Sequence, residues 1–409
     1  MTLEELFTRF PSVQQQGFTG AAYKPGLDGM RRFDSVLGSP WKNYRCIHVA
    51  GTNGKGSVCS MLTASLSASG FRTGLFTSPH IVDFTERMRL VSPDGRCEFI
   101  TMDEVRHFLD LYEPQMEGLS FFEITTGMAF WWFAKRKVDY AVVEVGLGGL
   151  LDSTNIITPE ISVITSIGLD HCSLLGNSRQ EIALQKAGIF KAGVPAVVGF
   201  KDEETGQVFT EVARQTGCPL YFVEEPLAEI PDLDLEGPCQ DQNYSTAARA
   251  LEIIGISPIP EAMARTAEIT SFHGRWERLS SNPEVIADIG HNPPALQKNF
   301  GKLEASGRPL AIVYGVMADK DLASISAYLP QGAKYFLCAP NTPRALPVDR
   351  LFLRIGELRP ELDCSAFDSV SSAVGAALEY AEGTEDCLVY IGGSTFVVTE
   401  AVVCFSDNS

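Results

Sequence analysis

Short runs of β-branched and other apolar residues alternate along this chain with segments of helical periodicity. The runs predict buried strands at residues 46–50, 140–145, 161–166 and 195–199. Helical patterns lie between them, as at residues 57–69, where apolar side chains recur every three or four positions until Gly70 provides a C-terminal stop. Strands that alternate with helices build parallel sheets with helices on their faces. The sequence therefore predicts an α/β fold.

A second alternating series begins near Val285. It follows a helical pattern at residues 243–254 and a stretch at 255–260 that holds two prolines and little periodicity. The strands expected in this series are residues 285–288, 310–315, 335–338 and 387–391, each followed by a helical pattern. The chain of 409 residues is long enough for two domains, and we expect them at residues 1–270 and 271–409. The second resembles a smaller Rossmann-like unit.

Composition and charge limit the partners of the chain. Hydrophobic residues make up 45% and charged residues 21%, as in folded soluble proteins. The formal net charge of −18 argues against nucleic acid, because phosphate backbones are bound by clustered lysines and arginines. The sequence shows neither a secretory signal nor an apolar stretch of the roughly 18 residues that a membrane span needs. The ten cysteines stand singly, as reduced thiols do. We expect a cytoplasmic protein with no nucleic-acid or membrane partner.

A glycine-rich loop links the first expected strand to the first expected helix. It reads GTNGKGS at residues 51–57. The glycines let the backbone wrap closely around an oxygen-rich group, and the free amides and dipole of the following helix favour an anion. Lys55 adds a positive charge for terminal phosphates. The spacing departs from G-x-x-x-x-G-K-[ST], and an ordinary glycine-rich turn is the alternative. The strand, loop and helix in this order favour a nucleotide-phosphate site.

Three potential metal ligands follow expected strands at one sheet edge. Ser78 lies in a TSPH segment that ends a short strand, Glu144 lies inside the apolar run 140–145, and His171 follows the run 161–166. A lone carboxylate inside a buried strand is costly unless it meets a cation. Taken singly, a Ser-Pro turn and a structural histidine are the plainer interpretations. Together, the three side chains predict a metal site, and hard oxygen ligands beside a nucleotide phosphate favour Mg²⁺.

An ordered set of motifs extends over nearly the whole chain. These motifs are GTNGKGS at 51, TSPH at 77, FFE at 121, EVGLGG at 144, LDSTN at 151, GLDH at 168, KAGIFK at 186, HGRWE at 273, D-x-GHNP from 288 and YGVMADKD at 314. With this set, the chain resembles the folylpolyglutamate synthase and dihydrofolate synthase enzymes of the Mur ligase superfamily. The resemblance implies a P-loop-containing parallel-sheet ATP-binding domain followed by a smaller Rossmann-like C-terminal domain.

The resemblance also implies a nucleotide and metal site. The family's ATP-binding positions match Thr52, Asn53, Gly54, Lys55, Gly56, Ser57, Asn243, Arg275 and Asp288. Its Mg²⁺ ligands match Ser78, Glu144 and His171, and a second divalent or monovalent cation is allowed. Lys186, within the helical pattern 179–190, matches the family's carbamylated lysine, whereas composition alone favours a solvated face for it. Lys55, Lys186 and His171 are thereby the implied catalytic residues.

A pterin-substrate site is implied as well. Its positions match Leu27, Asp28, Gly29, Phe122, Glu123, Leu151, Asp152 and Ser153. The chain departs from the family where GLGGR-LD is common, because Leu150 stands in place of the arginine, and Ile289 replaces a usual alanine. A guanidinium is thus missing beside the substrate loop. Arg87 and Arg89 are the nearest cations in the sequence that could replace it.

The chain is therefore expected to be a monomeric ligase that uses ATP to join L-glutamate to dihydropteroate or a reduced folate. A carboxylate is a poor electrophile at neutral pH, so an acyl phosphate is the expected intermediate. A ligase for a cell-wall peptide precursor is one alternative, against which the LDSTN and FFE motifs argue. A slowly hydrolysing nucleotide switch is another, but the sequence lacks an N-K-x-D signal and a switch has little use for the motifs after residue 273.

Overall fold

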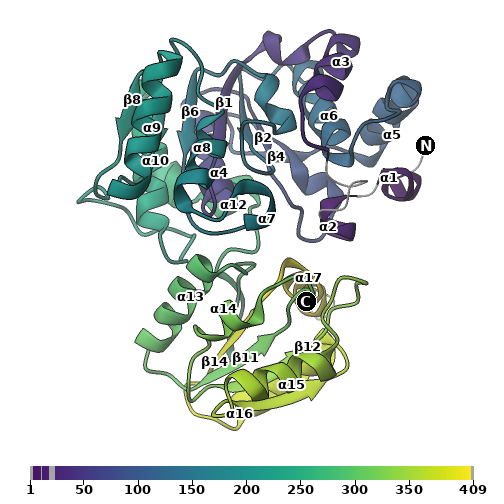
Figure 1. The fold of residues 1–409 in the computed structure, drawn as a ribbon, viewed down its shortest axis with the longest axis vertical. Coiled ribbons are helices and arrows are strands. Elements are labelled where there is room, and N and C mark those ends of the chain that lie inside the picture. Colours follow the sequence, from purple (N-terminus) through teal and green to yellow (C-terminus); the bar gives the residue numbers. More distant parts are fainter. Residues whose placement is uncertain (1–2, 11, 18–23, 407–409) are drawn as a thin grey trace. The chain divides into compact units, whose positions relative to one another are not determined.

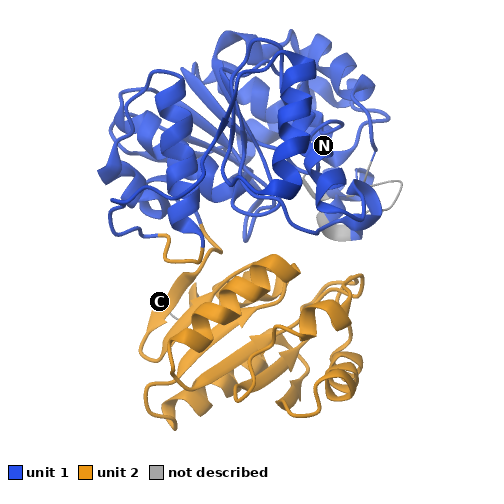
Figure 2. Ribbon diagram, turned by 60° about the vertical axis from the view of Figure 1, so that its left-hand side comes forward, with its two compact units in different colours: residues 1–234, 239–272 blue, residues 235–238, 273–409 orange. Residues whose placement is uncertain are grey.

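The computed structural model describes residues 3–10, 12–17 and 24–406, which form two compact units (Figure 2). Unit 1 comprises residues 1–234 and 239–272, and unit 2 comprises residues 235–238 and 273–409. Each unit is built on one β-sheet and has a hydrophobic core of its own. Each therefore has the organisation of a separate α/β domain.

An eight-stranded sheet forms the centre of unit 1, in the order β4-β3-β2-β5-β1-β6-β7-β8 (Figure 1). The strands β2, β5, β1, β6, β7 and β8 run parallel, which confirms the parallel sheet expected from the sequence. Near one edge, β3 runs antiparallel to both of its neighbours, β2 and β4. The segment between β2 and β3 is too short for a crossover helix, so β3 returns beside β2 in the opposite direction. The bounds are β1 Arg45–Ala50, β2 Thr73–Phe76, β3 Met88–Val91, β4 Cys97–Phe99, β5 Tyr140–Glu144, β6 Ile161–Ile164, β7 Ala196–Val198 and β8 Leu220–Phe222.

The strand register brings several chain segments out at one edge of this sheet. Phe76 of β2 pairs with Val143 of β5, and Val49 of β1 pairs with Glu144. Ala50, the last residue of β1, pairs with Ile164 of β6. The segments that follow these strands, among them the glycine-rich loop, therefore leave the sheet side by side.

The helices of unit 1 cover both faces of its sheet (Figure 1). One of them, α4, packs on β1, β2 and β5 and also contacts α10, α11 and α12. Its residues from Gly56 to Ser67 are all buried, so α4 is an inner helix of the unit. The bounds are α1 Leu3–Arg9, α2 Val13–Gln16, α3 Asp28–Leu37, α4 Lys55–Ala68, α5 Met102–Tyr112, α6 Phe121–Lys135, α7 Cys172–Leu175, α8 Arg179–Ala187, α9 Glu203–Thr216, α10 Gln240–Ile253, α11 Pro260–Ala264 and α12 Thr266–Thr270, with 3₁₀ helices η1 Pro40–Asn43, η2 Phe84–Arg87, η3 Glu113–Gln115 and η4 Ser153–Ile156.

A single face of β1 contributes to two neighbouring cores. Cys46 and Ala50 share this face because successive side chains of a strand alternate. Cys46 belongs to a core with residues of α3, α5 and α6, and Ala50 belongs to a core with residues of α8 and α9. His48, between them, points to the same face by the same alternation.

Unit 2 contains a six-stranded sheet in the order β13-β12-β11-β14-β10-β9. All of its strands are parallel except β9, which is antiparallel to β10. The expected strands correspond to β10, β11, β12 and β14, and the two edge strands β9 and β13 were not predicted. The bounds are β9 Glu277–Ser281, β10 Glu284–Ala287, β11 Leu310–Tyr314, β12 Lys334–Cys338, β13 Asp363–Phe367, β14 Leu388–Gly392, α13 Pro293–Ala305, α14 Leu322–Ser326, α15 Val348–Leu358, α16 Val370–Glu382 and α17 Thr395–Ser406.

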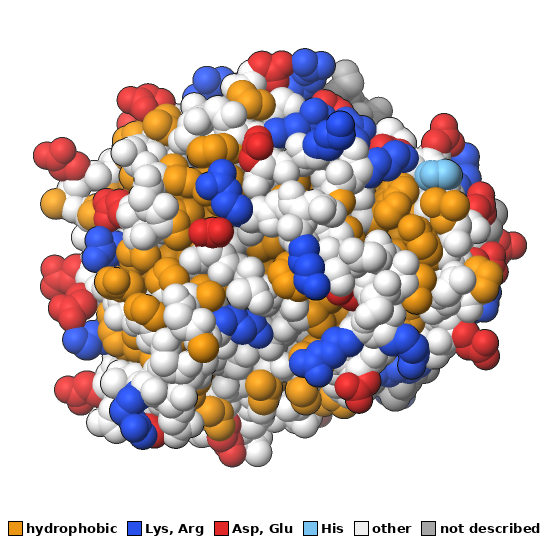
Figure 3. Space-filling model, turned by 90° about the horizontal axis from the view of Figure 1, so that it is seen from above, with side chains coloured by type: hydrophobic (Ala, Val, Ile, Leu, Met, Phe, Trp, Pro, Cys, Tyr) orange, Lys and Arg blue, Asp and Glu red, His pale blue; other side chains and the backbone are white. Residues whose placement is uncertain are grey.

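The face of the molecule drawn in Figure 3 is mixed in character. On the face drawn in Figure 3, lysine and arginine side chains stand singly or in small groups among acidic and hydrophobic ones. None of the helices in the described part of the chain is long and apolar enough to cross a membrane.

Candidate active site

The glycine-rich loop joins the end of β1 to the first residue of α4, Lys55. Gly54 precedes the helix with φ +86°, a conformation that L side chains rarely adopt. A Cβ at Gly54 would lie 2.4 Å from Asn243 Oδ1, and a Cβ at Gly51 would lie 1.8 Å from Thr165 Oγ1. Only glycine fits at these two positions, so the loop can pass closely between β6 and α10.

Residues that follow β6 hold the loop in place. Thr165 Oγ1 and Ser166 Oγ donate to Asn53 O at 2.6 and 2.9 Å, and Thr52 N donates to Ser166 O at 2.7 Å. Thr52 Oγ1 lies 3.1 Å from both the N and the O of Gly168. Thr165 and Ser166 were not among the predicted site residues, although their position at the end of the expected strand 161–166 was a signal for them. Together these bonds make the loop a rigid cradle.

Lys55 folds back over the loop. Its Nζ donates to Gly51 O and Thr52 O, both at 3.2 Å, and lies 4.0 Å from Glu144 Oε1. Gln240 Nε2 lies 3.5 Å from Ser57 Oγ near the start of α4, and the matched residue Asn243 donates from Nδ2 to Gln240 Oε1 at 2.9 Å. The lysine therefore places a positive charge at the mouth of the cradle, where a phosphate would bind.

The predicted metal ligands Ser78 and Glu144 meet at this edge. Ser78 N donates to Glu144 Oε2 at 3.0 Å, and the Glu144 carboxylate is buried. His171 precedes α7, and its Nε2 lies 3.7 Å from Asp170 Oδ2. No group of three His, Cys, Asp or Glu side chains with metal-binding geometry occurs in the described residues. The buried Glu144 carboxylate, held against the backbone of Ser78, nevertheless offers the hard oxygen ligands that a divalent cation prefers.

Lys186 is buried, which corrects the solvated face that composition favoured. Its Nζ donates to Gly51 O at 2.8 Å, the same carbonyl oxygen that Lys55 contacts. Burial, and then the charge of Lys55, lower the pKa of Lys186 to about 7. The buried side chains of Ile182 and Ala183 lie one turn earlier on α8, so helical spacing was the signal for this burial.

Residues 146–149, called the glycine turn below, follow Glu144 closely and contact the C-terminal end of α8. Leu150 N donates to Gln185 O at 2.8 Å. A Cβ at Gly149 would lie 2.8 Å from Gln185 O and 2.9 Å from Lys186 O, so this close approach requires glycine. The turn therefore helps to fix the backbone that carries Lys186.

The residues matched to the pterin site come from three segments that touch one another. Gly29, in the first turn of α3, lies against Glu123, whose Oε1 would be 2.4 Å from a Cβ at that glycine. Phe122, beside Glu123 in α6, lies against Gly146, whose Cβ would be 2.5 Å from the ring. Leu27 precedes α3 directly, and Asp28 is its first residue.

The third of these segments is the LDSTN motif. Asp152 and Ser153 are buried, whereas Leu151 is 44% exposed. The Asp152 carboxylate accepts hydrogen bonds from Leu147 N at 2.9 Å and Thr154 N at 3.0 Å. The motif thus folds back on the glycine turn. Contact of these residues with a substrate stays a prediction.

In unit 2, the matched residues Arg275 and Asp288 lie in connected loops. Asp288 is buried, and its Oδ2 accepts from Trp276 N at 3.0 Å. Its Oδ1 accepts from Gly290 N and from Asn299 Nδ2, both at 2.7 Å. The carboxylate thereby joins the HGRWE and D-x-GHNP motifs and fixes the backbone beside Arg275.

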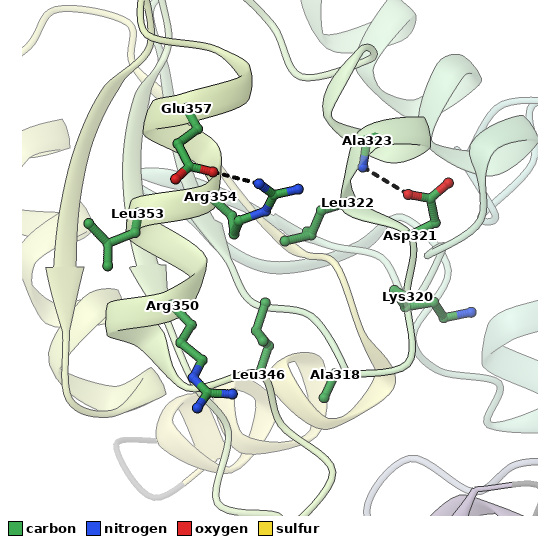
Figure 4. A pocket seen from close by; sticks show the side chains of 10 residues that line it. All are labelled: Ala318, Lys320, Asp321, Leu322, Ala323, Leu346, Arg350, Leu353, Arg354 and Glu357. Carbon is green, nitrogen blue, oxygen red and sulfur yellow. Dashed lines mark hydrogen bonds and ion pairs between the residues drawn. The ribbon is translucent and has the colours of Figure 1, made fainter.

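Unit 2 also has an open groove of about 490 Å³ between the end of the YGVMADKD motif and α15 (Figure 4). Leucine side chains, Arg350, and an ion pair of Arg354 with Glu357 at 2.5 Å line it. Asp321 lies at its rim and accepts from Ala323 N at 3.1 Å at the start of α14. None of the site residues predicted from the sequence lines this groove.

Comparison with known families and proteins connects this geometry to an enzyme class. The family described as Mur ligase middle domain matches residues 49–228, and the family described as Mur ligase, glutamate ligase domain, matches residues 274–394. The dihydrofolate synthase/folylpolyglutamate synthase of Escherichia coli is 34% identical over 363 residues, which cover 83% of this chain and 82% of that protein. The folylpolyglutamate synthase of Lacticaseibacillus casei is 34% identical over 76% of this chain and 81% of that protein.

Solved structures show the same relationship. The E. coli FolC protein in complex with DHPP and ADP has a TM-score of 0.86 and 29% identity, covering 100% of this chain and 99% of that one. The bifunctional folylpolyglutamate synthase/dihydrofolate synthase of Yersinia pestis, complexed with AMPPNP and a Mn ion, has a TM-score of 0.82 and 28% identity, covering 96% of both chains. This chain therefore belongs to the folylpolyglutamate synthase/dihydrofolate synthase family of Mur ligases.

Proposed function

We propose that this protein is an ATP-dependent ligase that joins the amino group of L-glutamate to the carboxylate of dihydropteroate, of a reduced folate, or of both. Its family supports this activity, as do related structures that contain ADP, AMPPNP, DHPP or L-glutamate. The observation that carries the proposal is the convergence of Lys55 and Lys186 on Gly51 O, with Glu144 4.0 Å from Lys55. The positive charge of Lys55 at this glycine loop suits the terminal phosphates of a nucleotide.

The reaction needs ATP because a carboxylate resists attack by an amine. Transfer of the γ-phosphoryl group to the carboxylate of the pterin substrate forms a new P–O bond and releases ADP. The glutamate amine then attacks the acyl carbon of this acyl phosphate, phosphate leaves with the former carboxylate oxygen, and the amine loses a proton. Lys55 neutralises the charge that develops on the phosphoryl oxygens during the transfer.

A divalent cation belongs to this reaction. Ser78, Glu144 and His171 would hold Mg²⁺, which supplies further positive charge to the phosphate oxygens when it is bound. A carbamylated Lys186 would add an anion to the site, and a second divalent or monovalent cation would balance it. The buried, hydrogen-bonded position of Lys186 supports such a role.

The remaining matched residues divide between the two substrates. For the nucleotide we assign Thr52, Asn53, Gly54, Lys55, Gly56, Ser57, Asn243, Arg275 and Asp288. For the pterin substrate we assign Leu27, Asp28, Gly29, Phe122, Glu123, Leu151, Asp152 and Ser153. The contacts of Gly29 with Glu123 and of Phe122 with Gly146 support the second group.

The proposal also covers the oligomeric state and the cellular compartment of the enzyme. We expect a monomer that acts on small molecules in the cytoplasm. All ten cysteines are thiols in the structure, which supports a reducing compartment.

Product analysis tests this function. The purified protein is incubated with ATP, Mg²⁺ and L-glutamate together with dihydropteroate, tetrahydrofolate or a cell-wall peptide precursor. Mass spectrometry should detect dihydropteroate or tetrahydrofolate extended by glutamate, with ADP formed in equal amount. Extension of the cell-wall precursor alone would contradict the proposal, and so would ATP hydrolysis without any ligated product, which is the behaviour of a nucleotide switch.

A further inference from the structure

His48 is a buried titratable side chain for which the proposed reaction has no use. It is fully buried in β1, three positions before Gly51. Its Nε2 lies 2.8 Å from Thr154 Oγ1, while its Nδ1 has no hydrogen-bond partner among the described residues. A histidine that served only to fill space could be replaced by an apolar residue, so the polar contact with Thr154 needs an explanation.

The neighbours of Thr154 decide the direction of this hydrogen bond. Thr154 Oγ1 donates to Asp152 Oδ1 at 2.5 Å, because a carboxylate can only accept. The only proton of the Thr154 hydroxyl is used in this bond, so the hydroxyl oxygen must accept a hydrogen bond from His48 Nε2–H. The opposite tautomer would leave a buried N–H at Nδ1 without an acceptor, which is costlier than an unused lone pair. His48 is therefore a neutral donor, and burial agrees, since it lowers the pKa of His48 to about 3.

The far end of this chain of hydrogen bonds reaches the glycine turn. Asp152 Oδ2 accepts from Leu147 N at 2.9 Å. Beside Leu147, a Cβ at Gly146 would lie 2.5 Å from Phe122 Cζ, so the ring rests directly on the turn. Asp152 and Phe122 both belong to the group assigned to the pterin substrate.

We propose that His48 and Thr154 form a buried relay that positions Asp152 and the Gly146–Leu147 turn, and thereby sets the affinity of the site for the pterin substrate. The relay starts on a central strand, where the backbone is held by neighbours on both sides. It ends on the turn that supports Phe122. His48 and Thr154 are positioning residues in this scheme, and neither touches a substrate. The proposal rests on the proposed function, because it concerns the pterin side of the same site.

Removal of the Thr154 hydroxyl breaks the relay at its centre. Thr154→Val is expected to weaken dihydropteroate binding, measured by calorimetry, about tenfold, the effect of one lost buried hydrogen bond, and to raise KM for dihydropteroate in parallel. KM for ATP should stay within about twofold, because the glycine-rich loop does not depend on this hydroxyl. Thr154→Ser keeps the hydroxyl and should restore the wild-type affinity.

His48 tests the other end of the relay. His48→Leu should weaken dihydropteroate binding as Thr154→Val does, whereas His48→Gln keeps a donor near the position of Nε2 and should bind nearly as well as wild type. The double variant His48→Leu/Thr154→Val should be no weaker than either single variant, because both break one chain of bonds. If a variant at one of the two positions fails to fold, the variants at the other position still test the relay.

Thr126 offers a matched control. It is a fully buried threonine of α6, and its hydroxyl has no hydrogen-bond partner among the described residues. Thr126→Val is expected to leave both KM values and dihydropteroate affinity unchanged. ¹⁵N NMR of the imidazole provides a readout that needs no turnover: Nε2 should be protonated and Nδ1 unprotonated from about pH 5 to about pH 8.

Several results would overturn the relay. They are unchanged dihydropteroate affinity in Thr154→Val, an equal loss of affinity for ATP and dihydropteroate, or a proton on Nδ1 of His48. Failure of the wild-type protein itself to bind either dihydropteroate or tetrahydrofolate would contradict the proposed function. The two failures are distinguishable, because in the first the wild type binds dihydropteroate and the variant binds it equally well.

Discussion

Two lysines from distant parts of the chain donate to one carbonyl oxygen, that of Gly51. Burial disfavours the charged form of Lys186, and the nearby ammonium of Lys55 disfavours it further, so the pKa of Lys186 falls to about 7. A neutral amine is therefore well populated at neutral pH, and this is the form that reacts with CO₂. The same two residues provide the sharpest tests at the residue scale.

Lys55→Ala is expected to lower kcat about 10²- to 10³-fold, because it removes a positive charge from the transferring phosphoryl group. The fold should persist, since the bonds of Lys55 go to its own loop. Steady-state kinetics and thermal melting check both expectations. Lys42→Ala removes the same charge from an exposed 3₁₀ helix and should change neither. Near-normal turnover of Lys55→Ala would remove the phosphate-loop assignment.

Lys186→Ala is expected to disable the enzyme, and acetate should partly restore it by taking the place of the carbamate. In the wild type, ¹³C NMR with labelled bicarbonate should show a carbamate signal that grows from about pH 6 to about pH 8, as the amine with a pKa of about 7 loses its proton. Lys186→Arg, which cannot form a carbamate, should lack the signal. Full activity of Lys186→Ala with no carbamate in the wild type would contradict this role.

Leu150 stands where the family commonly has arginine, and it is 44% exposed. Of the two cations that could replace the missing guanidinium, Arg87 is buried, donates from Nε to His80 Nδ1 at 2.8 Å and feels the charge of Glu144. The Arg89 guanidinium lies 5.8 Å from the centroid of the Phe99 ring and 5.9 Å from that of the Phe272 ring.

Kinetics on three variants therefore tests the replacement. Leu150→Arg should change activity only modestly, whereas Arg87→Ala or Arg89→Ala should raise KM for the pterin substrate or lower kcat. A large gain from Leu150→Arg with no loss in either arginine variant would show that the site is simply impaired.

The sequence predicted part of this residue-level detail. The shared edge of parallel strands placed Ser78 beside Glu144, and the structure joins them at 3.0 Å. The burial of Lys186 was missed because composition says nothing about which face of a helix meets the sheet. The relay from His48 was invisible for a similar reason, since Thr154 reaches it only through the folding of the whole unit. The catalytic and binding roles of the matched residues stay predictions.

At the scale of the elements, the central strands could be predicted from the sequence, whereas the edge strands of unit 2 could not. The central strands are runs of buried apolar residues, and the sequence predicted them. The edge strands β9 and β13 have mostly intermediate or exposed side chains, so they carry no such apolar run. Antiparallel pairing is confined to the margins of the two sheets, at β2–β3, β3–β4 and β9–β10, because short connections there allow it.

His48, in the central strand β1, is expected to make the folded state less stable at acid pH. Burial lowers the pKa of His48 to about 3, against 6.5 in the unfolded chain, so the unfolded state binds the extra proton between these values. Stability is therefore lost as the pH falls below about 6.5, by about 2 kcal/mol at pH 5. Denaturant unfolding at pH 7 and pH 5 should show this loss in the wild type and a smaller one in His48→Gln. Equal pH dependence in both proteins would contradict a buried neutral His48.

At the scale of the whole molecule, the candidate residues are divided between two units that each have a sheet and a core. The glycine-rich loop, the metal ligands, Lys186 and the pterin group belong to unit 1, whereas Arg275 and Asp288 belong to unit 2. The alternation of strands and helices in the sequence predicted the α/β layering of both sheets. Because both units contribute matched residues, the reaction has to be tested with the full chain.

An oxygen-18 experiment tests the proposed reaction most directly. Dihydropteroate labelled with ¹⁸O in its carboxylate is incubated with the full chain, ATP, Mg²⁺ and L-glutamate, and the released phosphate is analysed by mass spectrometry. Activation through an acyl phosphate transfers a carboxylate oxygen to phosphate, so the phosphate should carry ¹⁸O in step with the formation of the glutamate-extended product. Unlabelled phosphate alongside a ligated product would contradict the acyl-phosphate route, and ATP consumption that leaves both the labelled dihydropteroate and added tetrahydrofolate unchanged would contradict ligase activity itself.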